Sequence, residues 1–303
     1  MASSTSKQQK QYHVRSISLP ARSDPSTIRV AAELNKLKAW ETRACPLKAD
    51  AILGGLSGLA ELYECIHNLL QTPHAQQAQV SIRQENWVDE VLDGSVRLLD
   101  LCDNSRNILL QMREAVQALQ IALRRRGGEA SWESSINDYI CCQKKAKKEI
   151  EKCLGELKRL EAKLGSSSLP DSDSDHHLSA AVDALREASR SSICVFRLLL
   201  SFISSSSRTR TSKWSLVTKL LHKEQEATKE DEKLENEVKS VGDSLYALCR
   251  LNSNYDAKVE RVRETQKRLK AMEASVEGLE VGLERLLKSL IQTRVALLNN
   301  LCL

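Results

Sequence analysis

The stretch LLDLCDNSRNILLQMREAVQAL, residues 98–119, decides the fold class. Its apolar side chains return at helical spacing, through Leu98, Cys102, Leu109, Met112 and Val116. That spacing places them on one face of an α-helix and leaves charged and amide side chains on the other face. The pattern continues back to Trp87 and stops at Gly127 and Gly128. It therefore predicts one long amphipathic helix.

The segments on both sides of this stretch repeat the same period. Apolar side chains at helical spacing cover residues 28–40, 52–70, 132–160 and 178–203, and a further helical register begins at Leu216. Prolines and glycines separate these segments, with breaks at Pro46, Pro73 and Gly165, and no proline follows Pro170. No segment alternates as a strand does. The sequence predicts an all-α, multi-helix bundle.

Composition agrees with a helical protein that has a substantial core. The chain has 303 residues, of which 41% are hydrophobic and 28% are charged, with only 2 Phe. A sheet protein would need more aromatic and β-branched side chains. Within the LGGLSG stretch at 53–58, Gly54, Gly55 and Gly58 lack the Lys-Ser/Thr of a phosphate loop, so we expect them to allow close helix packing.

Low-complexity segments suggest how the chain is divided. We expect a flexible basic N-terminal segment at 1–23, a helical bundle region at 24–165, a linker at 166–176 and a C-terminal helical region at 177–303. The serine-rich stretch at 204–213 is also expected to be flexible. The alternative is that the C-terminal region packs on the first as one domain.

The C-terminal region carries a helix-packing seam. Its members step by four and three residues, and they are Leu234, Val238, Val241, Leu245 and Leu248. This pattern fits either a continuous coiled coil or a helical hairpin that bends near residues 252–254. We expect the seam to pack within the chain, and the alternative is packing across a dimer. The sequence leaves the oligomeric state open.

Charge and hydropathy exclude several classes of partner. The 45 basic residues are nearly matched by 40 acidic ones, so we expect no nucleic-acid binding. The most apolar run, 193–203, is too short to cross a bilayer and contains Arg197, so no transmembrane segment is expected. The basic clusters at 124–126 and 144–148 predict a solvated face, with peripheral contact to anionic lipid or to an acidic protein as the alternative.

The cysteines point to a reducing compartment. The chain has 9 of them, an odd number, and they form no CxxC pair. Reduced thiols predict a cytoplasmic protein. The alternative is import into a plastid or mitochondrion, because the first 16 residues are serine-rich, basic and free of acidic side chains, as a transit peptide is.

Two further motifs lack residues that a metal site or a nucleophile needs. The DSDSDHH stretch at 171–177 has His176 and Val182 where a calcium loop needs glycine and glutamate. Cys141 and Cys142 lie near lysines but have no histidine partner close in sequence. We therefore expect no catalytic residue, no metal site and no cofactor, and we do not expect an enzyme.

One short stretch outside the helices has a recognition pattern. In HVRSISLP, residues 13–20, Arg15 lies three residues before Ser18 and Pro20 lies two after it. This spacing resembles the phosphoserine ligands of 14-3-3 proteins, whose arginines bind the phosphate. The looser Arg-x-x-Ser/Thr pattern also occurs at 186–189, 208–211 and 250–253, so the motif arises by chance here too. Only the Ser18 copy has the proline.

Four stretches together resemble a known plant family. They are YHVRSISLP at 12–20, VLDGSVRLLDLCDNSRNILLQMRE at 91–114, RLLLSFIS at 197–204 and TRVALLNNL at 293–301. The chain is similar over nearly its full length to domain of unknown function 241, which is related to Bypass proteins. The resemblance implies a helix-rich plant protein linked to root and shoot development, with no established biochemical activity and no catalytic residue to assign.

Two functions from different classes follow. The first is a non-enzymatic interaction or scaffold protein whose protein partners include a phosphoserine-binding adaptor that recognises the N-terminal segment. The alternative is a helical-bundle enzyme or a small-molecule carrier with an interior pocket. The packing of the bundle interior distinguishes the two.

Overall fold

The computed structural model describes residues 25–43, 48–73, 86–125, 129–166, 176–205, 236–249 and 255–302. Every regular element in these ranges is an α-helix, so the prediction of an all-α bundle is confirmed. The helices are α1 (Pro25–Arg43), α2 (Ala49–Leu70), α4 (Asn86–Arg124), α5 (Glu129–Ser166), α6 (His176–Ser204), α8 (Glu237–Cys249) and α9 (Tyr255–Cys302). The expected flexible stretches at 1–23, 166–176 and 204–213 lie largely or wholly outside the described residues, as does the first part of the predicted C-terminal helical register, 216–235.

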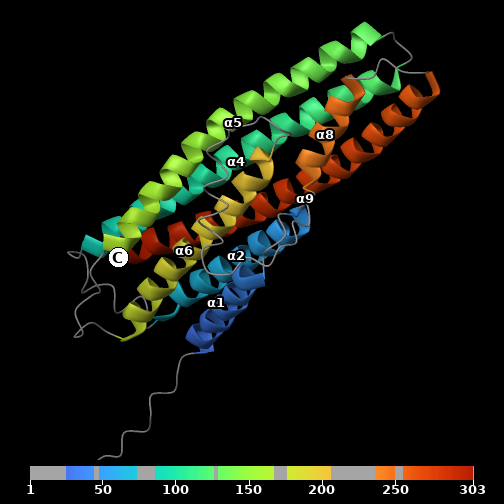
Figure 1. Cartoon of the computed structure of the whole chain (residues 1–303). Helices are drawn as coiled ribbons and strands as arrows, with labels where there is room; N and C mark the ends of the chain where they lie inside the picture. Colours follow the sequence, from blue (N-terminus) through green and yellow to red (C-terminus); the bar gives the residue numbers. More distant parts are fainter. Residues whose placement is uncertain are drawn as a thin grey trace, which may run out of the picture.

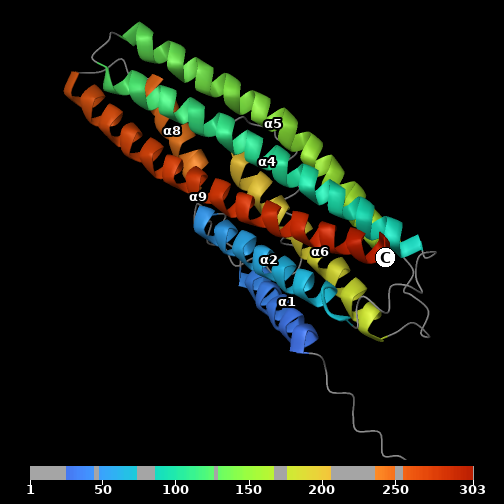
Figure 2. The ribbon, with the colours of Figure 1, turned by 180° about the vertical axis from the view of Figure 1, so that it is seen from behind.

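The 48-residue helix α9 organises the bundle. It packs against α2, α4 and α8 (Figure 1). Seen from behind, α9 lies between α2 and α4, while α5 covers the far side of α4 and α1 the far side of α2 (Figure 2). Gln266 donates to the carbonyl of Leu123 at 3.0 Å and Arg294 to that of Leu92 at 2.7 Å, so α4 and α9 run antiparallel.

One hydrophobic cluster joins helices on both sides of the predicted linker. It includes buried side chains from α1, α2, α4, α5, α6, α8 and α9. Leu98, Ile108, Leu185 and Leu199 are buried, as their place in the apolar pattern predicts. The apolar periodicity of 98–119 and 132–160 also predicts that Leu99 and Leu154 are buried. This prediction is wrong, because both lie at the edge of their apolar stripes and are half-buried.

The three glycines of the LGGLSG stretch allow α1 to approach α2 closely. A Cβ added to Gly55 would lie 2.5 Å from the Trp40 ring, and one added to Gly58 would lie 3.2 Å from Leu37 Cδ1. The Trp40 indole N–H donates to the carbonyl of Ala51 at 2.9 Å, which fixes the ring over the glycines. The packing role predicted for these glycines is confirmed.

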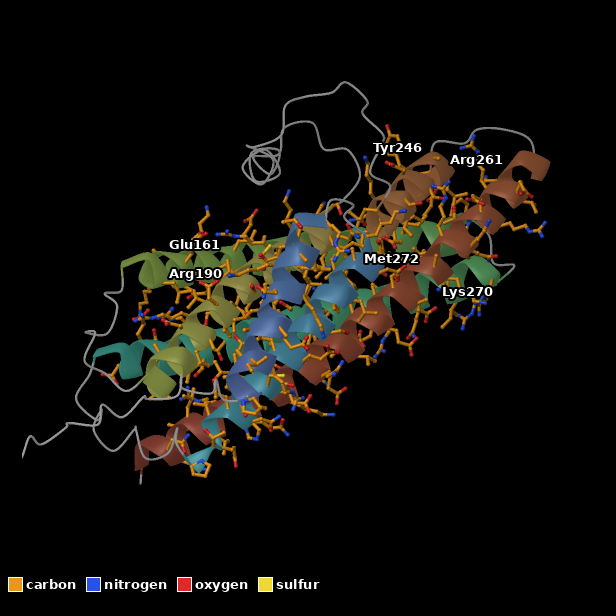
Figure 3. All side chains as sticks on the ribbon, turned by 90° about the horizontal axis from the view of Figure 1, so that it is seen from below. Glu161, Arg190, Tyr246, Arg261, Lys270 and Met272 are labelled. Atoms are coloured by element: carbon orange, nitrogen blue, oxygen red, sulfur yellow. The ribbon has the colours of Figure 1, made fainter. Side chains whose placement is uncertain are left out.

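Helices α8 and α9 form an antiparallel hairpin. The hydroxyls of Ser244 and Thr265 lie 2.6 Å apart, and Arg268 donates to the carbonyl of Ser240 at 3.2 Å. In this part of α9, buried apolar side chains lie on the side that faces the bundle, and exposed charged side chains lie on the other side. Figure 3 shows Met272 within the bundle and Lys270 projecting away from it.

Candidate functional site

The phosphoserine motif formed by Arg15, Ser18 and Pro20 lies outside the described residues. Of its three chance copies, only the one at 186–189 lies within them. Arg186 is buried, and the Ser189 hydroxyl donates to the carbonyl of Leu185 at 2.8 Å inside α6. Because a kinase needs an extended substrate, this copy is unsuited to phosphorylation.

The packing seam is placed by the α8–α9 hairpin. Val238, Val241, Leu245 and Leu248 are all buried, and α8 packs on α9 of the same chain. Leu234 lies outside the described residues. The seam is therefore part of the core.

Asn236 connects the start of α8 to the end of α6, a link that the sequence analysis missed. Its Oδ1 accepts a hydrogen bond from the Val238 amide at 2.8 Å, which caps α8. Its Nδ2 donates to the carbonyl of Phe202 at 3.1 Å. The available signal was an asparagine directly before an apolar helical pattern, but its second partner depends on the tertiary fold.

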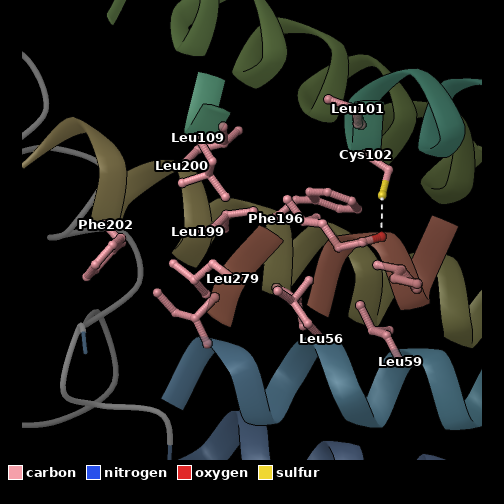
Figure 4. Packing of buried hydrophobic residues seen from close by; sticks show 14 of the residues in the cluster. Leu56, Leu59, Leu101, Cys102, Leu109, Phe196, Leu199, Leu200, Phe202 and Leu279 are labelled. Carbon is pink, nitrogen blue, oxygen red and sulfur yellow. Dashed lines mark hydrogen bonds between the residues drawn. The ribbon is translucent and has the colours of Figure 1, made fainter. Parts of the chain in front are cut away.

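The bundle interior is filled by large apolar side chains. Phe196, Leu56, Leu59 and Leu279 are each fully buried, and they come from α6, α2 and α9 (Figure 4). The Cys102 thiol donates to the carbonyl of Leu283 at 3.3 Å, and burial raises its pKa to about 12. A thiol held protonated in this way is a packing group and a poor nucleophile.

A small cavity lies where α4, α5 and α6 meet. Its volume is about 10 Å³, enough for about one water molecule. Arg186 and Glu90 line it, with 3.7 Å between Nη2 and Oε2. This space is far below the several hundred Å³ of a typical small-molecule site.

A larger, solvent-open groove of about 420 Å³ runs between α4 and α5. Arg97 crosses it, with distances of 3.0 Å to both Asp93 and Glu156. Lys163 contacts Asp93 at 2.7 Å, and hydrogen bonds from Lys163 and Arg97 lower the pKa of that carboxyl. The Asp93 and Glu156 carboxylates thus each have a basic partner, and these ion pairs help to hold α4 and α5 together.

The paired cysteines and the two basic clusters, which were the other candidates from the sequence, lie on separate surfaces. Cys141 is exposed, whereas the Cys142 thiol donates to the carbonyl of Gln111 at 3.5 Å and has its pKa raised by burial. A nucleophilic thiolate needs a lowered pKa, so the shift at Cys142 is in the opposite direction. Lys144, Lys145 and Lys148 are exposed on α5, as are Arg124 and Arg125 at the end of α4.

The described residues contain no group of three or more His, Cys, Asp or Glu side chains placed to hold a metal ion. The acidic stretch at 171–175 lies outside them. Among the described helices, none is long and apolar enough to cross a membrane.

These features define an all-α bundle of long helices with a tightly packed apolar interior. The chain belongs to the family described as Protein BPS1, because the family model matches residues 55–299. This match confirms the resemblance to Bypass-related proteins seen in the sequence. No curated protein matches the chain, and no solved structure matches it.

Proposed function

We propose that this BPS1-family chain is a non-enzymatic interaction protein of the plant cytoplasm that acts in root and shoot development. The helical bundle is a stable scaffold. The N-terminal segment docks a phosphoserine-binding adaptor once Ser18 is phosphorylated.

The packed interior carries this proposal. Helical bundles that bind cofactors or metals place polar ligands between their facing helices. Here Phe196, Leu56, Leu59 and Leu279 occupy that region. The cavity beside Arg186 and Glu90 has room for about one water. Both observations favour a scaffold over a carrier or an enzyme with an interior pocket.

Two arguments select Ser18 as the docking residue: the chemistry of phosphate recognition, and the state of the motif copy at 186–189. A phosphate adds about −1.5 to −2 charges and three acceptor oxygens, which an arginine cluster binds. A proline two residues after a phosphoserine disfavours continuation of a helix at that point. The copy at Arg186 and Ser189 is helical, with a buried arginine and an occupied hydroxyl.

A peptide pull-down tests the proposal. A synthetic peptide covering residues 11–25, phosphorylated at Ser18, is expected to retain an adaptor of the 14-3-3 class from plant extract, whereas the unmodified peptide does not. A phosphorylated peptide with Arg15→Ala is the matched control and should retain less adaptor. Equal retention by the phosphorylated and unmodified peptides would contradict the proposal, as would a mature protein that begins after Pro20.

A further inference from the structure

The outer face of α9 presents a row of exposed side chains with a regular repeat. From Ala274 to Leu298, every residue at alternating steps of three and four is exposed. The row includes Val281, Ile291, Val295 and Leu298, which are 64%, 46%, 49% and 36% exposed. Single exposed apolar residues are ordinary, but a heptad repeat of them on one helix face is typical of a helix-pairing surface.

This surface lies on the side of α9 that faces away from the core. Val276, Leu279, Leu283 and Leu286 on the opposite side of the helix are fully buried. Figure 2 shows α9 in front, with α2 and α4 on its two flanks. From Ala274 to Leu298 there are 24 steps along the helix, so at 1.5 Å per residue the row extends for about 36 Å.

A charged pair lies at the middle of the row. Lys288 Nζ is 3.2 Å from Glu284 Oε1, and both side chains belong to the exposed heptad positions. Val281 lies three residues before this pair and Ile291 three residues after it. The row therefore has opposite charges on the two sides of residue 286 and apolar side chains at its outer positions, except for Glu277.

We propose that this face of α9 binds a second copy of the same chain in antiparallel orientation. With the two-fold axis at residue 286, Glu284 meets Lys288 of the second copy, and Lys288 meets Glu284. Val281 then meets Ile291, and Ala274 meets Leu298. Glu277 lies opposite Val295, and this is the one pairing in the row that sets a charged side chain against an apolar one. Such a contact is isologous, so each pairing occurs twice.

Register and charge select this arrangement over a parallel one. In the heptad, Val281 and Ile291 occupy first and fourth positions, which face each other in antiparallel pairs. A parallel pair would place Glu284 against Glu284, which is repulsive. Arg285 approaches its own equivalent near the axis, but Glu61 Oε1 lies 3.5 Å from its guanidinium and offsets that charge.

Charge reversal in the full-length chain tests the register. Purified protein is expected to be a dimer by light scattering and sedimentation equilibrium. Glu284→Lys places lysines opposite each other at both crossings and should weaken the dimer by about tenfold, as should Lys288→Glu. The double variant E284K/K288E restores both pairs and should restore the dimer. Glu149→Lys reverses a charge in the exposed Glu149–Lys152 pair of α5 and should have no effect.

A second measurement maps the contact. A benzophenone side chain at position 281 should crosslink to the second copy near Ile291, as shown by mass spectrometry on a mixture of light and isotope-labelled chains. The proposal is overturned by a monomer, by a dimer that neither charge reversal weakens, or by a double variant that stays dissociated. Crosslinks to residues 206–235 of the same chain would also overturn it and would assign the face to that segment.

Discussion

The close approach of α1 to α2 predicts opposite effects for one substitution at two glycines. In Gly55→Ala, the new Cβ would lie 2.5 Å from Trp40 Cη2 and Cζ2, about 1 Å inside ordinary carbon contact. The indole cannot move aside freely, because its N–H is bonded to the Ala51 carbonyl. Overpacking destabilises the fold by about 1–3 kcal/mol, and loss of the indole hydrogen bond destabilises it by about 1 kcal/mol. Alanine offsets about 1 kcal/mol of this, because its helix propensity is higher than that of glycine. We expect a net loss of about 1–3 kcal/mol.

The control for this prediction is Gly155→Ala in α5. A Cβ at Gly155 meets nothing within 4 Å, so only the gain in helix propensity remains. This variant should be more stable than the natural chain by up to about 1 kcal/mol. The shared propensity term therefore cancels in the comparison, and the difference between the two variants measures the contact with Trp40.

Urea unfolding followed by far-ultraviolet circular dichroism measures both free energies. Trp40→Ala should remove most of the penalty of Gly55→Ala, because the double-mutant cycle isolates that contact. The reasoning would be refuted if Gly55→Ala stabilised the chain as much as Gly155→Ala does.

Three further variants test other parts of the bundle. Burial raises the pKa of Glu280 above its ordinary 4.5, although the Arg113 guanidinium lies 2.9 Å from its carboxylate. Ionisation of Glu280 therefore destabilises the fold as the pH rises. Glu280→Gln should raise the melting temperature at neutral pH but not below pH 4.5. Replacing Val241 and Leu245 together with Lys should destabilise the hairpin strongly in thermal melts, and unchanged stability and oligomeric mass would contradict the seam. Asn236→Ala should cost about 1–2 kcal/mol and speed amide exchange in α8.

Local signals in the sequence were sufficient to predict the helices. Pro46 lies just beyond the end of α1, and Gly127 and Gly128 lie between α4 and α5. The long apolar periods predicted α4 and α5 to within a few residues. These signals succeed because capping, helix breaking and amphipathic spacing act over one or two turns.

Helix pairing and the surface of α9 could not be predicted in the same way. An apolar stripe shows that a helix is buried on one side, but not which helix covers it. In α9, the sequence alone does not distinguish Val281 and Val295 from the buried apolar residues of the helix. Only the packing of α2 and α4 shows that they lie on the outer face. The double role of Asn236 also depends on the distant end of α6.

Calorimetric titration of the full-length chain with a purified adaptor of the 14-3-3 class tests the proposed function most directly. The chain phosphorylated at Ser18 should bind, and binding should be lost after phosphatase treatment and weakened by Arg15→Ala. Phosphorylation at the neighbouring Ser16 is the control and should not support binding. Equal affinity of the Ser18-phosphorylated and unmodified chains, or no binding by either, would contradict the account.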